Sequence, residues 1–366
     1  MVLYLKWLLV SRCSNRVSSI RYHYQHANAK LYSPFGMVKS YKSNKTEILG
    51  ALRPLNKNIG DELDTITQQK FLQPVLNGTE YTITLKNGQA VKLGPNSNYS
   101  GMTFVNCDLS ALSLTACDFS GCKFYNCRIE KSEFSYSSFQ DAIFRHCVLN
   151  ESVFLFATLN STILSHCDLT ATRYSYAKIS GAIFNENNMD QSLFLETQIL
   201  NSKFLNCKFD ECNMHKAKID KTMFRNILST ELSWSLKGSF IQKVQFVNCK
   251  TVSTVAVGAV FAECLFDRSN FWKSVFVGCS FYDSKFLHTG FNESELKQNK
   301  FVNSTMSACR FRVCVFSNST FKKCLISDCT LECADFRNVE FTDTPIENNY
   351  ISNEHYFKTV FPTENQ

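Results

Sequence analysis

The 366-residue sequence lacks several features on which common functional assignments depend. It has no apolar run of the roughly 18 residues that a membrane-spanning helix needs. With only 13 glycines, it shows no phosphate-binding glycine loop, no helical His-Glu-x-x-His and no nucleophile-elbow motif. Charged residues make up 19% of the chain and apolar residues 44%, a balance that excludes a disordered or charge-rich chain. We therefore expect a large buried core and no membrane span.

Acidic residues are missing from the first part of the chain. The formal net charge is +7, but residues 1–46 contain eight basic side chains and no acidic one, which leaves a net charge of −1 for the remainder. A nearly neutral body offers no basic groove for phosphates, so direct nucleic-acid binding is not expected. Electrostatics alone does not identify a partner.

What the sequence does contain is a repeat of five residues. Every fifth residue from Phe104 to Phe224 is apolar, at 25 positions of 25, and a second register from Phe246 to Ile351 is large and apolar at 20 positions of 22. The residue two places before each of these positions is small at 22 positions of the first 25. Neither the helical period of 3.6 nor the strand period of 2 gives this spacing. A chain that turns a corner every five residues does.

This unit of a small residue, any residue, a central Leu or Phe and two more residues resembles the pentapeptide-repeat family. The runs Cys122–Asn126, Ser132–Phe134, Ala182–Phe184 and Ser284–Phe286 carry the resemblance, which covers roughly residues 102–353. It implies an all-β fold, a right-handed quadrilateral β-helix in which four pentapeptides make one coil and the central and small residues point inward. Equivalent residues of successive coils would then stack at about 4.8 Å, giving a rod on the order of 55 Å long. The ends of such an array need caps.

The pattern divides the chain into six predicted segments. Two registers that differ by two residues make a phase break, which we interpret either as a bulge or kink in the rod or as a projecting recognition loop. Alternation around Asn87-Gly88 predicts a type I′ hairpin over Tyr81–Leu93, after a short helix near Asp61–Phe71. The segments are a basic, disordered leader (1–57), a helix and hairpin cap (58–100), a first repeat block (101–226), the interruption (227–245), a second repeat block (246–353) and a C-terminal cap (354–366).

The 17 cysteines do not indicate a metal or disulfide site. All but Cys13 and Cys333 occupy the small inward position, where a free thiol packs as a small hydrophobe, so reduced, buried thiols are expected. His146 and His166 each precede an inward cysteine and should face solvent, because adjacent strand residues point to opposite faces. We predict no metal, no cofactor and no catalytic residue, and interpret Cys333 as a surface thiol.

Outward aromatic residues are the remaining candidates for a partner contact. Tyr136, Phe156 and Tyr176 recur at every fourth pentapeptide, two places after a central residue, which predicts an aromatic stripe on successive coils. The same spacing is compatible with stacking that only stabilises the face. Trp234 and Trp272 are secondary candidates.

The function favoured by these observations is a non-enzymatic protein–protein interaction scaffold. Val38–Lys45 after Met37 is similar to the leaders of type III secreted effectors, so we expect export from a bacterial cytoplasm into a host cell. Two other interpretations of the N-terminal segment are open: a disordered tail without a targeting signal, and a mitochondrial transit peptide. Either Met1 or Met37 can be the start of the protein. A rod of this kind would be a monomer or an end-to-end dimer.

Two other functional classes fit the sequence less well. The repeats, such as Asp118–Phe124, resemble those of topoisomerase-binding proteins of the quinolone-resistance type, which mimic DNA with an acidic rod, but the net charge of −1 after residue 46 counts against this alternative. An enzyme with an accessory β-helix is disfavoured because only about 15 residues follow the repeats, too few for a catalytic lobe.

Overall fold

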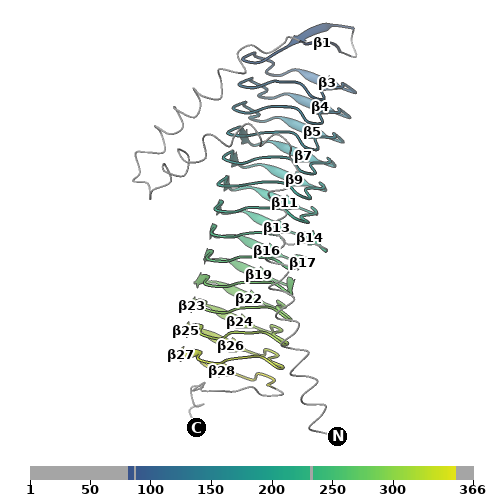
Figure 1. Cartoon of the computed structure of the whole chain (residues 1–366). Helices are drawn as coiled ribbons and strands as arrows, with labels where there is room; N and C mark the ends of the chain where they lie inside the picture. Colours follow the sequence, from purple (N-terminus) through teal and green to yellow (C-terminus); the bar gives the residue numbers. More distant parts are fainter. Residues whose placement is uncertain (1–80, 86–87, 231–233, 352–366) are drawn as a thin grey trace, which may run out of the picture. The chain divides into compact units, whose positions relative to one another are not determined.

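The computed structural model describes residues 81–85, 88–230 and 234–351, and within these ranges it contains strands but no helix. Successive coils of the chain stack into a column (Figure 1). Partners across neighbouring coils are separated by one full turn of four pentapeptides, as in Phe104 over Phe124 and Phe184 over Phe204. Each coil has four faces, and we number them in chain order. The all-β quadrilateral β-helix expected from the sequence is confirmed.

The four faces differ in how much regular strand they carry. The third face is joined by isolated bridges such as Ser113–Glu133, and the first, fourth and second faces form parallel sheets of 13, 10 and 3 strands. The first face holds β3 (Thr103–Val105), β4 (Lys123–Tyr125), β5 (Ile143–Arg145), β7 (Ile163–Ser165), β9 (Ile183–Asn185), β11 (Lys203–Leu205), β13 (Met223–Arg225), β16 (Gln245–Val247), β19 (Leu265–Asp267), β22 (Lys285–Leu287), β24 (Thr305–Ser307), β26 (Leu325–Ser327) and β28 (Ile346–Glu347). The fourth face holds β6 (Thr158–Asn160), β8 (Lys178–Ser180), β10 (Gln198–Leu200), β12 (Lys218–Asp220), β15 (Phe240–Gln242), β18 (Val260–Ala262), β21 (Ser280–Tyr282), β23 (Lys300–Val302), β25 (Thr320–Lys322) and β27 (Glu340–Thr342). The second face holds β14 (Leu228–Ser229), β17 (Lys250–Val252) and β20 (Asn270–Trp272).

The corners between faces are made by residues in the left-handed conformation. The residue two places after each central residue has a φ near 55°, as in Asn106 (55°), Asn126 (52°) and Asn206 (55°). This conformation is unfavourable for most side chains and least so for Gly, Asn and Asp. It turns the chain once per pentapeptide, which is the physical origin of the five-residue period.

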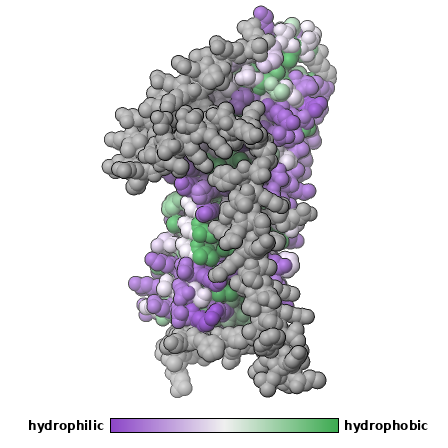
Figure 2. Space-filling model, in the orientation of Figure 1, coloured by the Kyte–Doolittle hydropathy of each residue, from purple (hydrophilic) through white to green (hydrophobic). Residues whose placement is uncertain are grey.

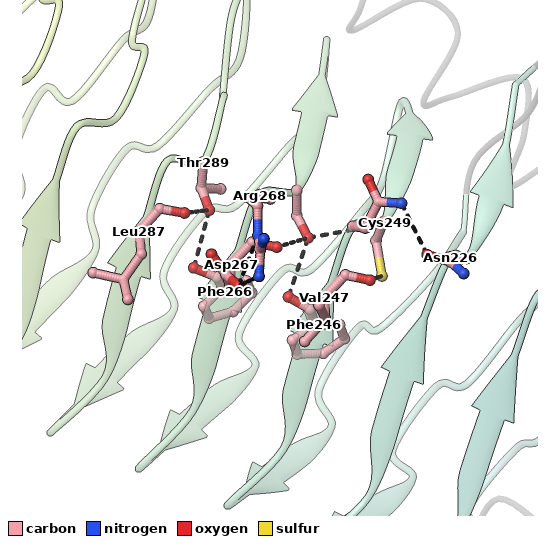
Figure 3. A network of polar contacts seen from close by, with 11 residues as sticks. Asn226, Phe246, Val247, Cys249, Phe266, Asp267, Arg268, Leu287 and Thr289 are labelled. Atoms are coloured by element: carbon pink, nitrogen blue, oxygen red, sulfur yellow. Dashed lines mark hydrogen bonds and ion pairs between the residues drawn. The ribbon is translucent and has the colours of Figure 1, made fainter.

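The small residue two places before each central residue is inward because it completes the backbone hydrogen bonding. Ser132 Oγ donates to the carbonyl oxygen of Leu109 in the preceding coil at 2.6 Å, and Thr162 Oγ1 donates to that of Phe139 at 2.7 Å. Figure 3 shows the same contact in the second block, where Thr289 Oγ1 lies 3.0 Å from the Phe266 carbonyl oxygen. A larger side chain would displace the central aromatic rings. The fifteen cysteines assigned to this position are all buried and free, as expected.

The central residues fill the column with stacked rings. On the first face the rings of Phe184, Phe204 and Phe224 lie 4.6 and 4.9 Å apart and within 9° of parallel. The stack continues from Phe224 to Phe246 at 5.4 Å and on to Phe266 at 4.9 Å. Offset stacking and edge contacts of this kind stabilise a core beyond the effect of area burial alone.

The phase break is a two-residue insertion that the column absorbs. Leu228 pairs with Lys208 one regular turn of four pentapeptides earlier, whereas the separation between Ser235 and its partner Asn213 is longer by two. The two extra residues therefore fall between Ser229 and Trp234. Across the insertion β13 pairs with β16, so the sheet of the first face continues without a break. An asparagine ladder crosses the same point: Asn226 Nδ2 donates to Asn206 Oδ1 at 2.7 Å, and Asn248 Nδ2 donates to Asn226 Oδ1 at 2.8 Å.

The hairpin β1 (Tyr81–Thr84) and β2 (Ala90–Leu93) precedes the first coil. Its turn is not the predicted type I′ turn: Leu85 accepts from the Gly88 N–H and donates to Gln89, the bonding of a three-residue loop closed by a left-handed glycine. Gly94 N–H donates to the Tyr99 hydroxyl at 2.7 Å, which ties the hairpin to the column. The predicted helix near 61–71, the leader and the C-terminal cap after residue 351 lie outside the described residues.

Candidate interaction surface

Because small and central residues point inward, only three positions of each pentapeptide reach the surface. These are the two residues that flank the central residue and the residue at the corner. Among the described residues, no helix is long and apolar enough to cross a membrane. Among them too, no group of His, Cys, Asp and Glu side chains is arranged to hold a metal ion. Any recognition chemistry in this part of the chain therefore depends on outward side chains.

The predicted aromatic stripe lies at the corner between the third and fourth faces. Tyr136, Phe156 and Tyr176 adopt φ values of 64°, 58° and 62°, so their side chains leave the column at equivalent corners. The rings of Tyr136 and Phe156 are 5.0 Å apart and 2° from parallel, and those of Phe156 and Tyr176 are 5.0 Å apart and 10° from parallel. Tyr176 is 45% exposed and the other two are half-buried. The stripe is thus a rigid stack that also presents aromatic surface.

The surroundings of the stripe are apolar on the third face and charged beyond its end. Leu155 and Leu195 are half-buried beside it, and Glu196 occupies the next corner after Tyr176. Burial, and then the charge of Glu196, raises the pKa of the Tyr176 hydroxyl, which stays protonated as a hydrogen-bond donor at neutral pH. Burial also raises the pKa of Glu133, although hydrogen bonds from Ser135 oppose that effect.

The two tryptophans have different environments. Trp234 is fully buried and packs against Phe209, Phe224 and Phe246, so the prediction that it is a surface contact is wrong. It occupies an inward position usually held by a small residue, and the two-residue shift of register hid this from the sequence pattern. Trp272 is 39% exposed on the second face, with Lys273 Nζ 4.4 Å from its ring centre.

His146, His166 and Cys333 all lie at corners of the column. The rings of His146 and His166 stack at 4.9 Å on successive corners, and His166 Nδ1 lies 3.2 Å from Glu186 Oε2. Both point away from the buried thiols of Cys147 and Cys167, as predicted. Cys333 is at a corner and is partly exposed.

An apolar surface that sequence reasoning missed lies further along the same corner. Phe240 is 46% exposed and Tyr282 is 38% exposed, both on the fourth face. Between them Val257 and Val260 flank the glycine corner Gly258. The signal was present in the sequence as apolar residues at outward positions, but it stands out only when residues from neighbouring coils are placed side by side.

Comparison with known proteins agrees with this architecture. Residues 97–174 match the family model described as a pentapeptide repeat region. No curated protein matches the chain. The fold is a β-solenoid with a filled interior and a corner every five residues, and its surface consists of the outward residues of the repeats. The chain thus contains a pentapeptide repeat region, and its described residues form a pentapeptide-repeat β-helix.

Solved structures that match this chain include both pentapeptide-repeat proteins and enzymes. HetL, a pentapeptide repeat protein involved in heterocyst differentiation regulation in the cyanobacterium Nostoc sp. strain PCC 7120, is 14% identical, with 68% of this chain and 87% of that chain covered and a TM-score of 0.20. QnrB1, a plasmid-mediated fluoroquinolone resistance protein, is 14% identical, with 67% and 91% covered and a TM-score of 0.28. The mannuronan C-5 epimerase AlgE4 A-module from Azotobacter vinelandii is 8% identical, with 71% and 91% covered and a TM-score of 0.31. Likenesses this low carry no argument about function.

Proposed function

We propose that the protein is a non-enzymatic protein–protein interaction scaffold, and that it acts as a bacterial effector secreted into a host cell. The observation that carries the scaffold role is the stacked stripe of Tyr136, Phe156 and Tyr176 on the surface of a column whose interior is filled. Preorganised, partly exposed aromatic side chains are typical anchors of protein interfaces, because they lose little conformational entropy on binding.

The secreted role is supported by composition rather than by geometry. Residues 1–46 combine eight basic side chains with no acidic one, and the stretch Val38–Lys45 is rich in Ser, Asn and Lys. DNA mimicry of the topoisomerase-binding kind would need an acidic rod. Basic side chains such as Lys203, Lys218 and Lys221 lie exposed on the column instead.

Affinity capture with the full chain as bait tests the scaffold role. The bait is exposed in parallel to a bacterial lysate and a human-cell lysate, and compared with a variant that carries Tyr136→Ser, Phe156→Ser and Tyr176→Ser. A matched control carries Ala171→Ser, Gln191→Ser and Glu211→Ser, which are equivalent corners of the second face.

Recovery of one host protein by the wild type and the control, and not by the stripe variant, would support both parts of the proposal. Recovery of gyrase or topoisomerase IV subunits from the bacterial lysate would replace it with the topoisomerase-binding alternative. Equal recovery by the stripe variant and the wild type would show that the stripe only stabilises its face.

A further inference from the structure

A continuous uncharged surface covers the third and fourth faces just beyond the phase break. On the third face Val255 pairs with Val275, and on the fourth face Val260 lies between Phe240 and Ser280. Most outward positions of the column carry polar or charged side chains, whereas Val255, Val260 and Val275 are apolar and half-exposed, and Phe240 is exposed. Figure 2 shows apolar surface partway along the column, with hydrophilic surface on either side. We call this the valine–glycine surface; its residues are Phe240, Val255, Val257, Gly258, Val260, Val275, Val277, Gly278 and Tyr282.

The corner that divides the two faces has no side chains here. Gly238, Gly258 and Gly278 follow one another with φ values of 64°, 66° and 66°. The same corner carries Tyr136 and Tyr176 in earlier coils at nearly the same φ, so the backbone does not require glycine. A Cβ atom at Gly258 or Gly278 would meet nothing within 4 Å. The glycines therefore flatten the edge, and the valines on either side form one accessible surface.

Lysines stand at both ends of this surface. On the third face, one row of outward side chains from successive coils consists of Lys237, Val257, Val277 and Lys297. On the fourth face, a second row begins with Lys218, Phe240 and Val260. This second row continues through Ser280 to Lys300. Within the part of the chain that the structure describes, Lys297 pairs with Glu295 at 3.3 Å, whereas Lys218, Lys237 and Lys300 have no ion pair.

Four acidic groups lie near this surface. Glu295 is paired with Lys297, and Asp220 occupies the position before Gln242, Ala262 and Tyr282 in successive coils. Glu263, at the outer corner of the fourth face, lies 3.7 Å from Lys243, and Asp283 at the next corner accepts a hydrogen bond from Asn303 at 3.2 Å. In sequence, residues 203–250 hold nine basic and four acidic side chains. The surface is therefore apolar in its centre, and three lysines at its rim, Lys218, Lys237 and Lys300, have no ion pair among the described residues.

We propose that the valine–glycine surface is a docking site for an acidic, amphipathic segment of a partner protein. Apolar side chains of the segment would lie over the valines and the flat glycine corner, and its carboxylates would reach Lys218, Lys237 and Lys300. Charge complementarity favours this occupant. A second copy of the chain would bring lysines against lysines, and residues 1–46 are basic without one acid. The proposal does not depend on the aromatic stripe, which lies in earlier coils.

Selection from a phage-displayed library of random short peptides tests the chemistry of the occupant. The full-length protein is the target, and Gly258→Glu is the counter-target, because a glutamate there would project into the flat corner and repel carboxylates. Gly121→Glu is the matched control: its φ is 68°, and a Cβ atom there meets only Gly101 backbone atoms, at 3.9 Å. Selected peptides are then labelled and titrated by fluorescence anisotropy, beside a single-stranded oligonucleotide.

The expected peptides combine Asp or Glu with Leu, Phe or Trp, and bind the wild type and Gly121→Glu alike. Gly258→Glu should weaken them by about tenfold or more, the effect of losing one good interface contact. Basic or wholly polar peptides, or peptides indifferent to Gly258→Glu, would overturn the proposal. Equal binding of the oligonucleotide, also weakened by Gly258→Glu, would replace a protein partner with a nucleic acid. An empty selection would overturn the proposal as well.

Discussion

The indole ring of Trp234 lies edge-on to the ring of Phe209, with 5.4 Å between ring centres and 80° between their planes. Phe209 belongs to the last regular coil before the phase break, and the central position one coil later is held by Ser229. The serine leaves the column short of a large side chain, and Trp234, displaced by the two-residue insertion into an inward position, supplies it. The two-residue insertion, the small Ser229 at a central position and the large Trp234 at a position usually held by a small residue thus compensate for one another.

Replacement of Trp234 by Ala is expected to lower the free energy of unfolding by about 3–5 kcal/mol, because it empties the site beside Phe209 that no neighbour can fill. Replacement of the half-exposed Trp272 by Ala is expected to change it by no more than about 0.5 kcal/mol. Urea titration followed by far-UV circular dichroism measures both. Equal effects of the two substitutions would contradict the burial assigned to Trp234.

Tyr174 is a central residue whose hydroxyl is buried and makes no hydrogen bond with any described residue. Its ring stacks on Phe154 at 5.2 Å and on Phe194 at 4.8 Å. Tyr174→Phe keeps the stack and removes the unpaired group, so we expect stabilisation by about 1 kcal/mol. The reverse change, Phe154→Tyr, serves as the control and should destabilise. A drop in melting temperature for Tyr174→Phe would show that the hydroxyl has a partner.

Val313 holds a corner at a φ of 57°, a conformation that is strained for a β-branched residue. Asparagine tolerates it, so Val313→Asn is expected to raise the stability by about 1 kcal/mol. Ala308→Val introduces the same strain at another corner, whose φ is 53°, and should lower the stability by a similar amount. Denaturant midpoints of the two variants should therefore move in opposite directions from that of the wild type.

The buried cysteines predict a loss of stability at alkaline pH. Burial raises the pKa of Cys207, Cys249 and Cys264 to about 12, against 9.0 for an exposed thiol. Because the folded state keeps these protons more tightly than the unfolded state, their contribution is complete below pH 9 and is lost as the pH rises from 9 towards 12. Melting temperatures measured from pH 7 to pH 11 in reductant should fall above pH 9.

A variant with Cys207→Ala, Cys249→Ala and Cys264→Ala provides the control. Its melting temperature at pH 7 should be lower than that of the wild type, because three buried sulfur atoms are lost. Its further fall between pH 9 and pH 11 should be smaller. An identical alkaline fall in both proteins would assign the effect to other groups, such as the tyrosines.

Two local patterns are enough to predict the coil, the inward cysteines and the outward histidines. They are the period of five residues and the pairing of each central residue with a small one, as in Cys122 and Phe124. Each of these depends on residues two to five places apart, which local backbone geometry controls. The turn of the first hairpin was predicted incorrectly because a two-residue and a three-residue loop share the Asn87-Gly88 signal. Trp234 was placed on the surface because a register shift of two residues changes the direction in which a side chain points.

The repeat, the filled core and the corner stripe of Tyr136, Phe156 and Tyr176 can be predicted from the amino-acid sequence alone, because similar five-residue units repeat the same local conformation. The folded column is needed to see how the phase break is absorbed and that Trp234 is buried. It is also needed to see that Val257, Val277 and Phe240 form one surface with lysines at its ends. Those relationships join residues of different coils or on different faces. They arise from the stacking of coils, which no single pentapeptide encodes.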